Sequence, residues 1–255
     1  MASVKKRSNN TFGAILAVVG IVGVVAIGWV MSRPPKVIKL DPADASIAAA
    51  GIVTGSPDAL VEVVEFADFE CPSCGYFATL HEPDVMARLV ATGEVRFRFM
   101  DYPLEMHRNT VAAHNAAHCA NEQGKFWDMH DRIFQNQEKW NTQAARDPRK
   151  VLKQLAGDAG LDVGKWEECY DSGRMLKQIA ANRRDGERLR VASTPTFMIG
   201  GQLIPGAISY DQFRQYVTLE KVRILASQSA QSGKPAVVPS TAASKAPSKA
   251  PSKAP

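Results

Sequence analysis

An uncharged run of apolar residues lies near the start of the chain, from Phe12 to Met31. As a helix rising about 1.5 Å per residue, this run would extend about 30 Å, the thickness of the hydrocarbon core of a bilayer. A cleaved signal peptide is the alternative, but its apolar region is about 7–15 residues long and ends at a site of small residues. Because Ser32-Arg33-Pro34-Pro35 follows instead, we expect residues 12–31 to be an uncleaved transmembrane anchor, preceded by a cytoplasmic segment, 1–11.

Two further segments lack the apolar periodicity of folded elements. Residues 32–57 are polar and rich in Pro and Ala, which is typical of a stalk. Residues 228–255 contain no aromatic residue and end in three Ser-Lys-Ala-Pro units. We expect them to be a disordered tail, since they bury too little surface to offset the entropy of ordering. The tail is either a basic spacer that touches the cell envelope or a solvated extension without a ligand.

The folded part begins with a strand, a helix and a second strand. Leu60–Ala67 is apolar apart from two glutamates, which predicts a buried strand with an acid inside the protein. Pro72 suits the first turn of a helix, where its missing N–H would have no partner, and Pro83 is expected to kink or divide that helix. Val95–Met100 alternates apolar and polar residues and is predicted to be a strand.

Only helices are expected between His107 and about Arg190. They are predicted at Arg108–Asn121, Lys125–Asn136, Pro148–Ala156, Val163–Tyr170 and Arg174–Val191. A hairpin of Thr196–Ile199 and Gln202–Ile204 follows, and a helix, Tyr210–Ala226, closes the domain. The pattern therefore predicts an α/β domain over residues 58–227, with a helical insertion at about 105–191.

The charges are distributed unevenly along the 255 residues. The chain has 31 Lys and Arg against 26 Asp and Glu, a formal net charge of +5. Ten of the basic residues lie in 1–39 and 234–255, which contain no acid, so residues 40–233 contain 21 basic and 26 acidic side chains. The folded domain is therefore acidic. The basic residues at the two ends are expected to influence membrane topology and contacts with the cell envelope. A nucleic-acid partner is not expected.

Two of the four cysteines, Cys71 and Cys74, stand three residues apart at the start of a predicted helix. The unpaired N–H groups and the positive dipole end of a helix favour a thiolate there. Only Cys71 is placed to be exposed, so it is predicted to be the nucleophile, with Cys74 as the buried resolving thiol. Half of a zinc knuckle has the same spacing, but it needs a second pair, and Cys119 and Cys169 are isolated.

Two more features support redox chemistry. Glu65 precedes Cys71 by six residues and lies on the strand that leads to the motif, where a buried carboxylate would move protons for Cys74. Thr194-Pro195 interrupts the chain where a sheet edge would continue, as expected for a cis-proline loop that faces the cysteines.

Together, the segments VEFADFECPSC, GKFWDMHDRIF and ASTPTFMIGGQLIPGAISYDQF resemble the DsbA-like thiol:disulfide oxidoreductases of the thioredoxin superfamily. The resemblance covers roughly residues 56–225 and implies a thioredoxin fold with a helical insertion. It implies that Cys71 exchanges disulfides, Cys74 resolves them and Glu65 is the buried acid. Thr194 and cis-Pro195 would bind the substrate backbone.

The dipeptide between the cysteines departs from the strongest oxidases of that family. Those enzymes have a His there, whereas this chain has Pro72-Ser73. We also expect Pro72 and Ser73 to contact the bound substrate. Because no His stabilises the thiolate here, the pKa of Cys71 should be lowered less than in those oxidases. We therefore expect a reduction potential between the thioredoxin and DsbA values, about −270 and −120 mV.

The remaining candidate residues lie in the insertion. Cys119 and Cys169 would be either a structural disulfide in an oxidising compartment or two buried thiols, and both interpretations stay open. His114 and His118 have a metal-ligand spacing without a carboxylate at a suitable offset, so ordinary helix histidines are favoured over a metal site. No metal and no cofactor is expected.

The predicted function is that of a thiol:disulfide oxidoreductase in the cell inner membrane, with its domain on the periplasmic side. Oxidation of exported protein substrates is favoured, and a membrane redox partner would recycle the cysteine pair. Lys and Arg are nearly balanced around the apolar run, so this orientation depends on the oxidising compartment that the cysteines need. A reductase or isomerase with the same site, and a non-catalytic envelope binding module, are the alternatives.

Overall fold

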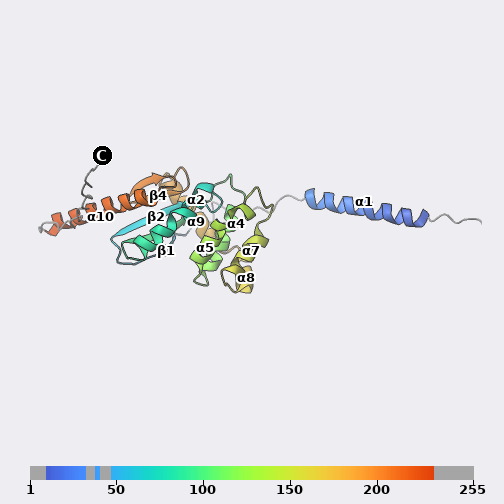
Figure 1. Cartoon of the computed structure of the whole chain (residues 1–255), viewed down its shortest axis with the longest axis horizontal. Coiled ribbons are helices and arrows are strands. Elements are labelled where there is room, and N and C mark those ends of the chain that lie inside the picture. Colours follow the sequence, from blue (N-terminus) through green and yellow to red (C-terminus); the bar gives the residue numbers. More distant parts are fainter. Residues whose placement is uncertain (1–9, 33–37, 41–46, 233–255) are drawn as a thin grey trace, which may run out of the picture.

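A five-stranded sheet forms the centre of the folded domain (Figure 1). The computed structural model describes residues 10–32, 38–40 and 47–232. The strands are β1 (Ile52–Thr54), β2 (Val61–Ala67), β3 (Val95–Asp101), β4 (Thr196–Ile199) and β5 (Gln202–Pro205). Their order is β1-β3-β2-β4-β5, with β2 and β3 parallel and the other neighbours antiparallel. The predicted α/β architecture is confirmed.

Strand β1 lies inside the segment that the sequence predicted to be a stalk. Val53 of β1 pairs with Arg98 of β3. Just before the strand, the side chain of Asn182 binds both backbone groups of Ala50, at 2.8 and 3.1 Å. The boundary at residue 58 is therefore too late, because a strand of three residues is too short to show an alternating pattern. Residues 33–37 and 41–46 of the predicted stalk lie outside the described residues.

The helices follow the predicted order. The first group is α2 (Pro72–Leu80), α3 (Glu82–Val85) and a π-helical turn, η2 (Met86–Val90). The insertion contains α4 (Thr110–Asn121), α5 (Phe126–Gln135), α6 (Gln137–Trp140), α7 (Arg149–Asp158), α8 (Val163–Ser172) and α9 (Leu176–Arg188). Helix α10 (Tyr210–Ser232) extends six residues beyond its predicted end and includes residues 228–232 of the predicted tail. The remaining tail, 233–255, lies outside the described residues.

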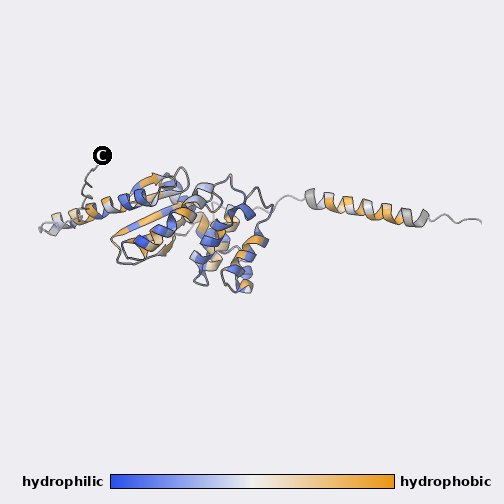
Figure 2. Ribbon diagram, in the orientation of Figure 1, coloured by the Kyte–Doolittle hydropathy of each residue, from blue (hydrophilic) through white to orange (hydrophobic). Residues whose placement is uncertain are grey.

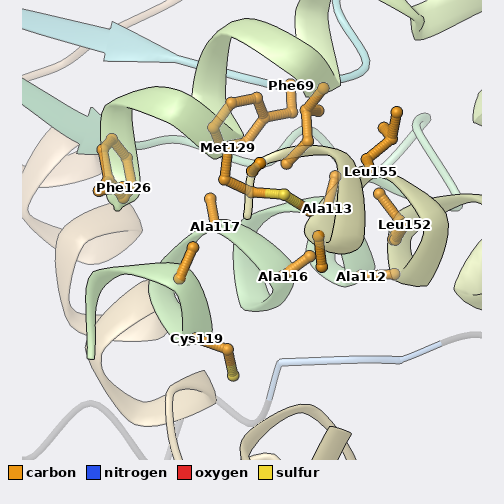
Figure 3. Packing of buried hydrophobic residues seen from close by; sticks show 14 of the residues in the cluster. Phe69, Ala112, Ala113, Ala116, Ala117, Cys119, Phe126, Met129, Leu152 and Leu155 are labelled. Atoms are coloured by element: carbon orange, nitrogen blue, oxygen red, sulfur yellow. The ribbon is translucent and has the colours of Figure 1, made fainter. Parts of the chain in front are cut away.

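Two large apolar cores meet near the cysteine pair. One lies between the sheet and helices α2, α3 and α10, and includes Phe77, Phe97, Phe197 and Phe213. The other fills the insertion, where the small residues of α4 let α5 and α7 pack closely (Figure 3). Phe69, two residues before Cys71, points into this second core beside Met129 (Figure 3). The segment that contains the cysteines is thus attached to the insertion.

Residues Asn10–Ser32 form the long helix α1. Residues 15–29 of this helix are mostly apolar (Figure 2), and their large apolar side chains, from Ile15 to Trp29, are exposed. Over the part of the chain that the structure describes, no helix is both long and apolar enough to cross a membrane.

Candidate active site

The Cys71-Pro72-Ser73-Cys74 motif lies at the N-terminus of α2, directly after β2 and a short loop. Cys71 is the N-cap residue and Pro72 occupies the first turn, where no backbone donor is needed. Cys71 is 8% exposed and Cys74 is fully buried, while Pro72 and Ser73 lie on the surface. Cys71 is thus less exposed than predicted, although its sulfur is the outer one of the pair. Both thiols are free.

The surroundings of the two sulfurs give them opposite acidities. A hydrogen bond from Cys74 is the largest influence and lowers the pKa of Cys71 to about 6, with help from Thr194 and the backbone N–H groups of Cys74 and Ser73. Burial raises the pKa of Cys74 well above its usual value, and the charges of Cys71 and Glu65 add to this effect. At neutral pH, Cys71 is therefore mainly a thiolate and Cys74 a thiol, the arrangement that disulfide exchange needs.

The Thr194-Pro195 peptide bond is cis and lies against the motif. The Cys71 Sγ is 3.4 Å from the carbonyl oxygen of Thr194, across 123 residues of sequence. Pro195 leads directly into β4, which pairs with β2, so the sheet brings the two segments together. The tertiary structure thus places Thr194 and Pro195 beside the Cys71 sulfur.

Glu65 is buried in β2, between its register partners Phe99 and Phe197. Burial, followed by the negative charge of Cys71, raises its pKa to about 8. One carboxylate oxygen of Glu65 has no hydrogen-bond partner among the described residues. An acid with this pKa is suited to accept and return the proton of Cys74 near neutral pH.

Asp68, which the sequence analysis missed, connects the loop before the motif to the insertion. Its buried carboxylate accepts hydrogen bonds from the Thr110 hydroxyl and the Leu104 N–H, at 2.5 and 2.8 Å. It also pairs with His107 at 2.8 Å, and this hydrogen bond is the largest influence that raises the His107 pKa. The Asp68 N–H lies 3.5 Å from the Cys74 sulfur.

Glu70 is a second acid that the sequence did not single out, and it also connects the loop before the motif to the insertion. Its carboxylate accepts hydrogen bonds from the backbone N–H groups of Asn109 and Thr142. Gln137 of α6 donates to the carbonyl oxygens of Phe69, at 2.8 Å, and Cys71, at 3.0 Å. Acids directly before a cysteine motif were the available signal, but the partners named here lie 36 or more residues away in sequence. The insertion thus fixes the conformation of the reactive loop.

The insertion also contains the other two cysteines and the histidine pair. Cys119 of α4 and Cys169 of α8 form a disulfide, which decides between the two interpretations that the sequence left open. His114 and His118 both bind the carboxylate of Asp101, at 2.6 and 2.7 Å. Asp101 lies on β3 and not on α4, so a search for a carboxylate close to the two histidines in sequence did not find it. Among the described residues, no group of three metal-ligating side chains has a metal-site arrangement.

Comparisons with known proteins place this geometry in a family. A family model described as thioredoxin matches residues 48–218, more than half of the chain. The disulfide bond formation protein D of Bacillus subtilis is 26% identical over 66% of this chain and 75% of its own length. A Na(+)/H(+) antiporter NhaA of Salinispora tropica is 35% identical over 59% of this chain, and the match spans only 22% of the antiporter.

Solved structures of DsbA proteins share the fold. Wolbachia pipientis α-DsbA1 matches with a TM-score of 0.63 and 17% identity, over 72% of this chain and 98% of its own. Oxidised BdbD of Bacillus subtilis matches with a TM-score of 0.59 and 22% identity, over 74% of this chain and 98% of its own. The match of residues 48–218 to the family model, with the cysteine pair at the start of α2, shows that this chain belongs to the thioredoxin family, with the DsbA-like fold.

Proposed function

We propose that this protein is a protein thiol:disulfide oxidoreductase. The observation that carries the proposal is the pair of Cys71, whose pKa is lowered to about 6, and the buried Cys74, whose pKa is raised, with Thr194-Pro195 beside them. Relatives named for disulfide bond formation support the same function.

As an oxidase, the protein would accept two electrons from a substrate dithiol. A substrate thiolate attacks Cys71 of the Cys71–Cys74 disulfide, and Cys74 leaves as a thiolate that takes a proton from Glu65. The second thiolate of the substrate then attacks the substrate sulfur that is bonded to Cys71. This step forms the substrate disulfide and releases the Cys71 thiolate. Because a thiol of low pKa is a good leaving group, this direction is favoured. A membrane redox partner would reoxidise the pair.

The test is a pair of cysteine substitutions. Cys71→Ala is expected to abolish exchange with a reduced protein substrate, and Cys74→Ala to accumulate mixed disulfides visible by mass spectrometry of alkylated samples. Full activity of Cys71→Ala would favour a non-catalytic binding module. Alkylation of the protein in cells separates an oxidase from a reductase or isomerase, because an oxidase keeps the pair mainly as a disulfide.

Anchoring and location are parts of the same proposal. The uncharged apolar sequence of residues 12–31 supports a single membrane anchor, although no helix among the described residues meets the length and hydropathy of a membrane span. A cysteine pair that oxidised exported substrates would need an oxidising compartment, which supports a domain outside the cytoplasm, in the periplasm. Membrane fractionation of the full chain and of a variant that lacks residues 1–33 tests the anchor. Recovery of the full chain in the soluble fraction would contradict it, and protease access in spheroplasts tests the side on which the domain lies.

A further inference from the structure

A second buried acid, Glu82, lies near the site and has no part in the mechanism above. Glu82 is the first residue of α3 and is 3% exposed. Burial raises its pKa, and the charges of Glu65 and Asp131 raise it further. Burial and the negative charge of Glu65 thus both favour the protonated form of Glu82.

The imidazole of His130 faces Glu82. The Nε2 atom of His130 lies 3.8 Å from Oε2 of Glu82, and neither atom has a hydrogen-bond partner among the described residues. A shift of roughly 1 Å would bring the two atoms to hydrogen-bond distance. His130 also lies against the ring of Phe99, with centroids 5.3 Å apart, and Phe99 is the β3 register partner of Glu65. Glu65, Glu82 and His130 therefore occupy one buried region.

The other face of His130 leads to solvent. Its Nδ1 lies 2.9 Å from a carboxylate oxygen of Asp131, whose side chain is 59% exposed. His130 itself is fully buried among aromatic rings, and burial lowers its pKa, although the hydrogen bond and the charge of Asp131 oppose this shift; His114 on α4 adds a smaller lowering. A neutral imidazole that donates from Nδ1 to Asp131 presents its Nε2 lone pair to Glu82. One nitrogen thus faces the buried acids and the other faces the surface.

We propose that Glu82 and His130 form a proton route between Glu65 and solvent at Asp131, and that this route serves Cys74. The inference depends on the proposed exchange at Cys71 and Cys74. When Cys74 attacks a mixed disulfide on Cys71, its thiol proton moves to Glu65, the new S–S bond forms and the bound thiolate leaves. Glu65 then returns its proton to solvent through Glu82, His130 and Asp131. In the opposite direction the same residues supply the proton that the Cys74 thiolate takes up.

The two steps of exchange can be measured separately by quenched flow. The reduced full-length protein is mixed with oxidised glutathione, and mass spectrometry follows first the mixed disulfide on Cys71 and then its resolution by Cys74. Glu82→Gln and His130→Gln are expected to slow resolution roughly 10- to 100-fold at neutral pH and to leave the first step unchanged, because only resolution moves the buried proton. Equal resolution rates in both variants and the wild type, across the pH range, overturn the proposal.

Two surface variants keep the test independent of folding defects. Asp131→Asn removes the carboxylate that would take the proton from His130, whereas Asp128→Asn is a matched change of an exposed acid on the same helix. Slower resolution is expected for Asp131→Asn alone, and identical rates for these two variants would overturn the route.

A chemical rescue separates proton transfer from packing. His130→Ala leaves a space of the size of a five-membered ring. Imidazole in the buffer is expected to restore resolution, and pyrrole, which has a similar shape without a basic nitrogen, is not. Equal rescue by both would show that His130 acts only through packing. A wild-type protein that forms no mixed disulfide would instead contradict the proposed function and, with it, this inference.

Discussion

At the scale of single residues, Cys71 and Cys74 have the same side chain, but their surroundings shift the pKa values of the two thiols in opposite directions. Cys71 receives hydrogen bonds that favour a thiolate, and the buried Cys74 is surrounded by groups that oppose a second negative charge. Because the largest influence on Cys71 is the hydrogen bond from Cys74, the two acidities depend on each other.

Cys74→Ala is therefore expected to raise the pKa of Cys71 from about 6 toward that of a free thiol, about 8.5. The rate of Cys71 alkylation as a function of pH measures this shift, with intact mass spectrometry to confirm single modification. Ser73→Ala is the control, since it leaves the Cys74 thiol and the backbone donors in place. A Cys71 that still titrates near 6 in Cys74→Ala would mean that Thr194 and the helix terminus lower its pKa without the Cys74 thiol.

Glu65 is expected to make the stability of the reduced protein depend on pH. Its pKa is about 8 in the folded protein and 4.5 without burial, so between these values the folded state binds the proton more strongly. Unfolding then releases a proton, and stability falls as pH rises, by up to about 1.4 kcal/mol per pH unit. Urea unfolding of Glu65→Gln should lack this contribution. Parallel stability curves for variant and wild type would contradict it.

At the scale of elements, the helical insertion and the sheet form the site jointly. The sheet supplies Glu65 and the cis-proline loop, while α4, α6 and the loops beside them bind the segment before Cys71 through Asp68, Glu70 and Gln137. Within the insertion, the Cys119–Cys169 disulfide joins α4 to α8.

Removal of that disulfide is expected to destabilise the protein without stopping exchange. The disulfide closes a loop of 50 residues, for which the loss of chain entropy in the unfolded state corresponds to about 4 kcal/mol. Urea unfolding of the Cys119→Ala/Cys169→Ala double variant measures the change. The exchange rate with a reduced substrate is the control, and its loss would place this disulfide in the redox path.

Close packing of α9 on the sheet depends on Gly186. A Cβ atom there would lie 2.6 Å from the Tyr102 ring and 3.1 Å from Phe66, and the Tyr102 hydroxyl is bound to the Val191 carbonyl at 2.7 Å. Gly186→Ala is therefore expected to cost about 1–3 kcal/mol of stability.

The matched control is Gly157→Ala in α7, where the nearest atom would be 3.7 Å away. It should stabilise the protein by roughly 0.5–1 kcal/mol, since alanine favours helix. Thermal unfolding of both variants tests the pair, and equal effects would contradict the packing argument.

At the scale of the whole molecule, the proposed redox site lies within one described segment, residues 47–232. This segment contains 21 basic and 24 acidic side chains, although the full chain is +5. Basic charge is thus concentrated toward the ends, and every residue of the proposed mechanism lies in the acidic part.

A protein limited to residues 47–232 is expected to exchange disulfides at the rate of the full chain and to bind an anion-exchange resin at neutral pH. Stopped-flow exchange with a reduced substrate and ion-exchange elution measure the two properties. A large loss of rate with the fold retained would show that the ends take part in the reaction.

The amino-acid sequence by itself determined the order of the elements and the reactive motif, because both depend on residues close together in the chain. An apolar run with two glutamates marked β2, alternation marked β3, proline marked the start of α2, and the Cys71–Cys74 spacing marked the chemistry. Only the tertiary structure decided what depends on distant residues: the pairing of β1 with β3, the Cys119–Cys169 disulfide and the partners of Asp68 and Glu70. It also decided the acidities of Cys74, Glu65 and Glu82, since a pKa in a protein depends on burial and on neighbouring charges that no local pattern records.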